Sequence, residues 1–136
     1  MQKKIFFLLI AFVFFNKSNA QFTAGNIVVY RIGEGTATAT TLGANDAFAV
    51  FLDEYTPSGT LVRSIAMPAT DNGSNKSLTA SSSDGIAGSG MLNLSADGQY
   101  LVFTGYNAPL GTTGLGGTRS NVTARVIGLV KYDGTI

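Results

Sequence analysis

The chain is 136 residues long and nearly neutral, with 9 basic and 8 acidic side chains and a net charge of +1, and it contains neither cysteine nor histidine. The basic residues are scattered along the sequence, which leaves no electrostatic footprint for nucleic acid. Without cysteine there are no disulfides, and without histidine the commonest general base and zinc ligand are missing. We therefore expect no catalytic residue, no metal site and no cofactor, although the length suffices for one hydrophobic core.

Residues 1–20 have the pattern of a secretory signal peptide. Two lysines precede an uncharged apolar run over residues 5–15, and a small-x-small ending follows at Ser18 and Ala20. The run is short for a membrane span, which needs about 20 residues, and an N-terminal anchor is the alternative. We expect cleavage after Ala20. This leaves a β domain over residues 21–136 with no membrane span, either extracellular, at the cell surface or in the periplasm.

The remaining sequence has the pattern of antiparallel strands separated by turns, so we expect an all-β fold. Residues 27–32, IVVYRI, are rich in β-branched and aromatic side chains and predict a mostly buried strand. Residues 47–55 are apolar on both faces, and the TPSG sequence at 56–59 predicts a turn into a returning strand over residues 61–67. The small polar segment 36–44 is interpreted as a loop, with a thin edge strand as the alternative.

Two long segments have the composition of loops. Residues 69–90 are dominated by Ser, Gly, Asn, Asp and Thr, which predicts a segment too polar to bury, with one short strand near residues 77–80. Residues 107–120 contain glycines at four positions and predict a flexible loop. Connections longer than about 12 to 15 residues are usually functional or mobile. The first loop is therefore the preferred place for a binding surface, with plain disorder as the alternative.

An Asp-Gly pair organises the C-terminal half of the chain. Asp97 and Gly98 lie between apolar arms over residues 91–94 and 99–106. Such a pair is typical of a two-residue hairpin turn in which both residues adopt positive φ. The sequence therefore predicts a hairpin here, with Asp97 and Gly98 in a structural role.

A second Asp-Gly pair stands near the end of the sequence. Residues 122–132 predict the last long strand, and Asp133 and Gly134 predict a structural turn behind it. A turn calls for a returning strand that pairs with the free edge. We expect either a short clasp or a chain that continues past residue 136, and we prefer the second.

The predicted hairpin around Asp97 and Gly98 resembles the blade motif of secreted bacterial β-propellers of the TolB and WD40-like type, S-x-D-G-x-Y-L-x-F-T. The matching residues are Ser95, Asp97, Gly98, Tyr100, Leu101, Phe103 and Thr104. Residues 131–136 are a partial echo of the motif, and residues 26–35 and 51–68 are similar to the opening of large secreted bacterial repeat proteins. The resemblance implies propeller-like blades. A propeller needs about four or more blades of four strands, so this chain would be its N-terminal part, and a small β-sandwich is the alternative.

Other candidate sites have simpler explanations. Asp53 and Glu54 are an adjacent acidic pair, but neighbours on a strand point to opposite faces. We therefore expect a solvated pair at a strand end rather than the two carboxylates of a glycosidase. Residues 71–75, DNGSN, lack the alternating acidic positions of a calcium loop, and residues 114–118 lack the lysine of a phosphate loop. The first segment is interpreted as a turn-rich loop, and the second as part of the flexible loop over residues 107–120.

Tyr55, Tyr100 and Tyr106 are the candidate ligand-facing aromatics, because tyrosine rings can stack on sugars; packing in the core is the other explanation. We expect a non-enzymatic secreted or cell-surface β-repeat protein that acts as a scaffold or interaction module. Its partner would be an unidentified protein or glycan. The alternatives are an N-terminal fragment of an extracellular hydrolase or lyase, and a carbohydrate-binding module.

Overall fold

The computed structural model describes residues 21–33, 43, 45–81 and 91–136. Within them the regular structure is almost entirely strand, which confirms the all-β fold. The strands are β1 (Ile27–Ile32), β2 (Ala47–Tyr55), β3 (Leu61–Ala66), β4 (Thr79–Ser81), β5 (Asn93–Leu94), β6 (Tyr100–Tyr106) and β7 (Arg125–Lys131), and Leu115–Gly117 form a 3₁₀ turn, η2. The expected signal peptide and most of the expected loop over residues 36–44 lie outside the described residues.

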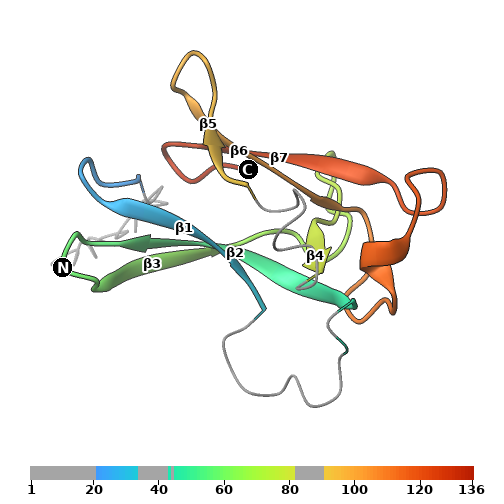
Figure 1. Cartoon of the computed structure of the whole chain (residues 1–136). Coiled ribbons are helices and arrows are strands. Elements are labelled where there is room, and N and C mark those ends of the chain that lie inside the picture. Colours follow the sequence, from blue (N-terminus) through green and yellow to red (C-terminus); the bar gives the residue numbers. More distant parts are fainter. Residues whose placement is uncertain (1–20, 34–42, 44, 82–90) are drawn as a thin grey trace, which may run out of the picture.

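The strands form one antiparallel sheet that curls on itself as a half-barrel (Figure 1). β2 joins its parts: the C-terminal half of β2 pairs with β1 and β3, and the N-terminal half pairs with β4. β4 continues the sheet to β6, which pairs with β5 and, over its whole length, with β7. The curl brings the β1–β2–β3 ribbon below the β5–β6–β7 ribbon in Figure 1, and the core lies between the two ribbons.

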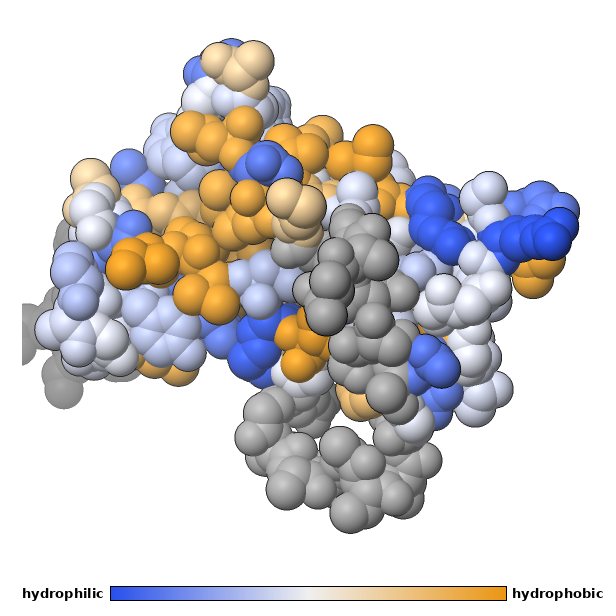
Figure 2. Space-filling model, viewed as in Figure 1, coloured by the Kyte–Doolittle hydropathy of each residue, from blue (hydrophilic) through white to orange (hydrophobic). Residues whose placement is uncertain are grey.

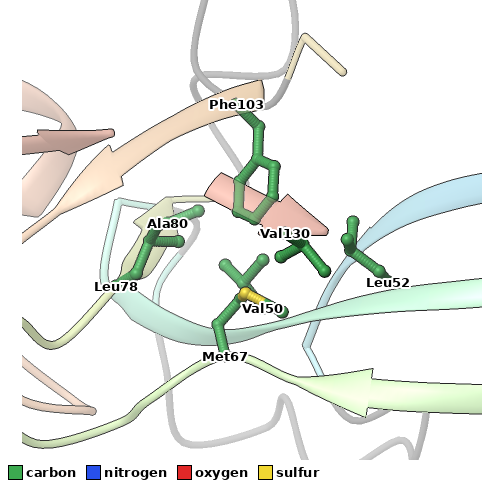
Figure 3. Packing of buried hydrophobic residues seen from close by; sticks show 7 residues of the cluster. All are labelled: Val50, Leu52, Met67, Leu78, Ala80, Phe103 and Val130. Atoms are coloured by element: carbon green, nitrogen blue, oxygen red, sulfur yellow. The ribbon is translucent and has the colours of Figure 1, made fainter. Parts of the chain in front are cut away.

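The core forms where the two ribbons present apolar side chains to each other. Its buried members are Val50, Leu52, Met67, Leu78, Ala80, Phe103 and Val130 (Figure 3). The Tyr30 ring of β1 meets the Phe103 ring edge to face, with centroids 5.5 Å apart. A second, smaller cluster consists of Ala47, Tyr106, Ala108 and Leu115.

Two turns share one hydrogen-bonding geometry. In the turn over residues 56–60, the Gly59 N–H donates to the Thr56 carbonyl, and the Thr56 N–H donates to the Thr60 carbonyl, both at 2.9 Å. The turn over residues 131–135 repeats this pattern, with distances of 2.9 and 2.8 Å. The φ angles are 85° at Gly59 and 81° at Gly134. Each is a three-residue hairpin loop that glycine closes, because glycine adopts positive φ without steric cost.

The predicted hairpin between β5 and β6 is present, but its turn differs from the expected two-residue form. Gly98 has φ 71° and donates to the Ser95 carbonyl at 2.8 Å. The Ser95 N–H donates to the Tyr100 carbonyl at 2.8 Å, which closes a four-residue loop. Among the described residues only glycines have positive φ, so Asp97 does not share this conformation. The hairpin is confirmed, and the expectation of two residues with positive φ is wrong.

The short strand predicted near residues 77–80 is confirmed as β4, but the prediction that the 69–90 segment is too polar to bury is wrong for residues 77–81; residues 82–90 lie outside the described residues. Residues 77–81 are all buried. The Thr79 hydroxyl lies 3.1 Å from the Ala108 carbonyl and 3.3 Å from that of Tyr106. Because these hydrogen bonds replace those to water, small polar residues can occupy the middle of the sheet.

Two other expectations are corrected in part. β1 is covered on one face only, since Ile27 and Val29 on its other face are 55% and 44% exposed. The glycine-rich segment 107–120 follows a defined path through η2, and Leu115 within it is fully buried. Leu115 fixes this loop because it packs into the second cluster.

Candidate binding groove beside strand β7

A groove of about 480 Å³ runs along the outer edge of β7. Met67, Pro68 and Leu78 provide apolar side chains in its lining. Other lining residues come from β6, from β7, from the turn near residue 75 and from the C-terminal turn; they are Ser74, Asn75, Lys76, Tyr100, Val126, Ile127, Gly128, Leu129, Lys131, Thr135 and Ile136. The groove therefore combines an apolar floor with a strand edge and a few polar groups.

The strand edge in this groove has unpaired backbone groups. In an antiparallel pair, alternate residues direct both N–H and C=O toward the partner strand or away from it. The Asn107 N–H donates to the Ala124 carbonyl, so the backbone groups of Ala124 face the β6 side. Every second residue after it, namely Val126, Gly128 and Val130, therefore belongs to the set that bonds to β6. Ile127 and Leu129 belong to the other set, so their N–H and C=O groups point away from β6. No other described strand pairs with this edge of β7.

The side chains of the same two residues are exposed. Ile127 is 70% exposed and Leu129 is 47% exposed. Figure 2 shows that hydrophobic residues gather in a band over the β5–β6–β7 ribbon and extend toward the other ribbon, rather than standing singly. Exposed large hydrophobic residues in this part of the chain also include Met91, Leu94 and Ile136. A contiguous apolar surface of this kind marks an interaction site more often than isolated exposed residues do.

Basic side chains stand at both ends of the exposed stretch of β7. Arg125 stacks over the Tyr106 ring, with its guanidinium carbon 4.1 Å from the ring centroid, and also donates to the Thr123 carbonyl at 2.6 Å. Lys131 lies at the other end, where the Asp133 carboxylate is nearby. Lys76 lines the groove but forms an ion pair with Asp71, with an N–O distance of 2.5 Å. Arg125 is not part of the groove lining, so the basic side chains of the groove are Lys131 and the paired Lys76.

The three candidate ligand-facing tyrosines occupy separate places. Tyr100 lines the groove, opposite Lys131 in the sheet. Tyr106, at the other end of β6, is only 3% exposed and belongs to the second core cluster. Tyr55 is half-buried at the far end of β2. The structure does not bring them together into one aromatic platform.

The Asp97 and Asp133 side chains both stabilise turns. The Asp97 carboxylate accepts from the Ser95 hydroxyl at 2.5 Å and from the Gln99 N–H at 3.1 Å, and these bonds lower its pKa. The Asp133 carboxylate accepts from the Thr135 N–H at 2.9 Å, which likewise lowers its pKa. In both turns the carboxylate binds the N–H two residues later, as Asp side chains do in Asx turns.

Asp53 and Glu54 point to opposite faces, as expected, but the prediction that they are solvated is wrong. The Asp53 side chain is 3% exposed and accepts from Arg31 and from Ser64, each at 2.5 Å. The Glu54 side chain is fully buried and accepts from Arg63 at 2.7 Å. Burial alone would raise the pKa of each carboxyl, but hydrogen bonds and the arginine charges outweigh it, so both pKa values lie below the ordinary range.

The 71–75 segment forms a tight turn in which Asn72 and Asn75 exchange backbone hydrogen bonds at 2.9 and 3.0 Å. The Asp71 carboxylate accepts from the Lys76 ammonium and from the Ser77 N–H, and these contacts lower its pKa. Within the described residues, no group of three or more His, Cys, Asp or Glu could hold a metal ion. The Asp71 oxygens therefore serve the turn.

The groove residues were not recognised as a site from the sequence. The alternation of residues 125–131 does show a strand with apolar residues at 127 and 129, but it does not show which edge lacks a partner. Neither family models, nor curated proteins, nor solved structures gave a match to this chain. In the described part of the chain, no helix is long and apolar enough to cross a membrane.

Proposed function

We propose that the chain is an exported, non-enzymatic β protein that acts as a scaffold or interaction module, and that its partner binds in the groove beside β7. The observation that carries this proposal is the apolar surface along β7, where the side chains of Ile127 and Leu129, which line the groove, are 70% and 47% exposed. Removing the apolar part of this surface from water would lower the free energy by about 25 cal/mol per Å² buried.

Site-specific photo-crosslinking in the organism that makes the chain tests this proposal. A benzophenone amino acid at position 127 is expected to give a discrete adduct that mass spectrometry identifies. Val122 is 76% exposed and lies outside the groove, so the same probe at position 122 is the matched control. A folded, correctly exported protein that gives no adduct from position 127 contradicts the proposal.

Export rests on residues 1–20, whose basic start, apolar run and small-residue ending suit a cleaved leader. The place of action is the extracellular space, the cell surface or the periplasm, in a bacterial source. Intact-mass analysis of the purified protein checks it: a mature chain that begins at Gln21 is expected. Recovery of the uncleaved chain from the cytoplasm would contradict export.

A propeller-like repeat is the architecture we favour over a small sandwich. The turns at Asp97 and Asp133 support it, because each combines a glycine of positive φ with a carboxylate bound to the N–H two residues later. The echo of the motif near residue 131 thus includes the glycine of positive φ and the carboxylate contact, although the two loops contain four and three residues. Reading the gene past codon 136 tests the repeat: further S-x-D-G-x-Y motifs at a regular spacing are expected, and a stop codon there would contradict it.

Carbohydrate binding is a second candidate, because Tyr100 lines the groove and could stack on a sugar ring. A glycan array with the mature chain and with Tyr100→Ala separates the two candidates. Retention of a glycan that is lost in Tyr100→Ala would assign the groove to carbohydrate. No retention would leave the protein partner as the proposed occupant.

A further inference from the structure

We infer that Asn72 is a site of spontaneous covalent modification, at which the Gly73 nitrogen closes a cyclic imide and water opens the ring to aspartate or isoaspartate. Ser74 and Asn75 of the same turn line the groove beside β7, but the reaction requires no partner in that groove. Three features support the site: the Asn-Gly sequence, the freedom of both reacting groups, and the restraint of the other candidate residues.

The reaction needs only the chain and water. The Gly73 backbone nitrogen gives up its proton and attacks Cγ of the Asn72 carboxamide. A bond between this nitrogen and Cγ forms, the bond from Cγ to the amide nitrogen breaks, and ammonia leaves with the proton. Water then adds to one of the two imide carbonyls. Opening at Cγ gives aspartate in an ordinary backbone, and opening at the α-carbonyl gives isoaspartate, in which the backbone runs through Cβ and Cγ.

Asn72 is the only asparagine of the chain that a glycine follows. A side chain on the following residue crowds the attacking nitrogen, whereas glycine has no Cβ. At Gly73 the space where a Cβ would stand is open, since no heavy atom other than those of its chain neighbours lies within 4 Å. Asn121 is exposed as well but precedes the β-branched Val122, which makes it a matched control within the same molecule.

Both reacting groups are free and in contact with solvent. Residues 72–74 are all exposed, and Gly73 has φ 61° at the tip of the turn. Among the hydrogen bonds of the described residues, the Asn72 carboxamide takes part in none, and the Gly73 N–H donates in none. The carboxamide can therefore rotate toward the Gly73 nitrogen without breaking a contact of its own.

Other described residues that could form an imide are restrained. The Asn26 carboxamide donates to the buried Glu54 at 2.7 Å. Asp97 and Asp133 also precede glycine, but each carboxylate accepts from the N–H two residues later. An ionised carboxylate is also a poorer target for a nitrogen nucleophile than an amide is. The reaction therefore favours Asn72.

The hydrogen bonds of the turn limit the rate. Asn72 and Asn75 exchange backbone hydrogen bonds at 2.9 and 3.0 Å, and the Asp71 carboxylate binds the Lys76 ammonium and the Ser77 N–H. The turn must open before the backbone nitrogen reaches Cγ. Local opening of an exposed turn costs much less free energy than global unfolding does, so the reaction proceeds in the folded protein.

Both products change the rim of the groove. Each adds a carboxylate beside Asp71, whose own carboxylate forms an ion pair with Lys76. Isoaspartate also lengthens the backbone by a methylene group, which disrupts the exchange of hydrogen bonds between positions 72 and 75. Asn75 lines the groove, and its side chain lies 3.3 Å from the Ile136 carbonyl. The modification therefore alters this rim irreversibly, because no step of the reaction restores the amide.

Incubation of the purified wild-type chain in mildly alkaline buffer tests the site. Peptide mass spectrometry over a time course measures the loss of the amide at each asparagine, and isoaspartyl methyltransferase detects the isoaspartate product. The amide at position 72 is expected to be lost while Asn121 remains intact. The loss should be faster at higher pH, because the deprotonated Gly73 nitrogen is the nucleophile.

Two further samples separate reaction at this turn from general alkaline chemistry. Asn72→Gln keeps an amide but adds a methylene group, so the five-membered ring cannot form and position 72 should stay intact; circular dichroism confirms that the variant folds. Wild type unfolded in guanidinium chloride should lose the Asn72 amide faster than the folded chain. Loss at Asn121 before Asn72, or a folded chain that keeps the Asn72 amide after the unfolded sample has lost it, overturns the inference.

Discussion

The ring of Phe103 on β6 lies over the backbone of Gly128 on β7, its direct partner in the sheet. A Cβ atom at position 128 would stand 2.5 and 2.6 Å from two ring carbons of Phe103. Glycine is therefore required here by packing, because the space above its Cα is filled by the largest fully buried side chain of the core. An aromatic ring that covers a cross-strand glycine also shields the sheet from water.

Replacement of Gly128 by alanine should destabilise the protein by about 1 to 3 kcal/mol, the usual cost of overpacking a core. Chemical denaturation of Gly128→Ala against wild type measures this. Gly117→Ala is the control, since nothing lies within 4 Å of a Cβ there. If the ring is the obstacle, Phe103→Leu combined with Gly128→Ala should cost less than the sum of the two single changes.

Alanine at Gly98 should also destabilise the protein, but through the backbone. A Cβ at Gly98 would meet nothing within 4 Å, whereas its φ of 71° is strained for other residues. The left-handed conformation costs about 1 to 2 kcal/mol for a residue with a side chain and less for asparagine. Thermal unfolding should therefore rank wild type above Gly98→Asn and Gly98→Ala last. Equal stability of the two variants would contradict this explanation.

The sequence predicts the strands well where the information is local. The apolar run of β2 and the glycines at positions 59 and 98 set the strands and turns that the structure contains. The burial of β4 was harder to predict, because the Thr79 hydroxyl donates to backbone carbonyls that lie about thirty residues later in the chain. The composition of a short stretch of sequence does not indicate such distant hydrogen-bond partners.

The candidate site illustrates the same limit. Asp53 and Glu54 are correctly placed on opposite faces by strand alternation, but their burial depends on Arg31 and Arg63, which come from the strands on either side. The groove likewise depends on which edge of β7 is unpaired, and only the topology of the sheet decides this. Local pattern thus predicts the elements, while the pairing partners make the site.

Glu54→Gln should be among the most destabilising polar substitutions in the described residues. The change leaves the Arg63 guanidinium, whose side chain is 14% exposed, without its buried counter-charge. Removing one partner of a buried pair costs about 3 to 5 kcal/mol. Asp71→Asn is the control, because its pair with Lys76 is exposed and worth at most about 1 kcal/mol. Urea denaturation at neutral pH measures both, and similar losses would contradict a special role for Glu54.

Stability should fall as the solution becomes acidic. The folded-state pKa values of Asp53 and Glu54 lie below their ordinary values of 3.8 and 4.5. The stabilisation they give is complete above those ordinary values and is lost as the pH falls through the folded-state values. Denaturation curves should therefore be flat near neutrality and shift to lower denaturant below about pH 4.5. In Glu54→Gln the acid-dependent part should be smaller, and an unchanged pH profile would contradict this assignment.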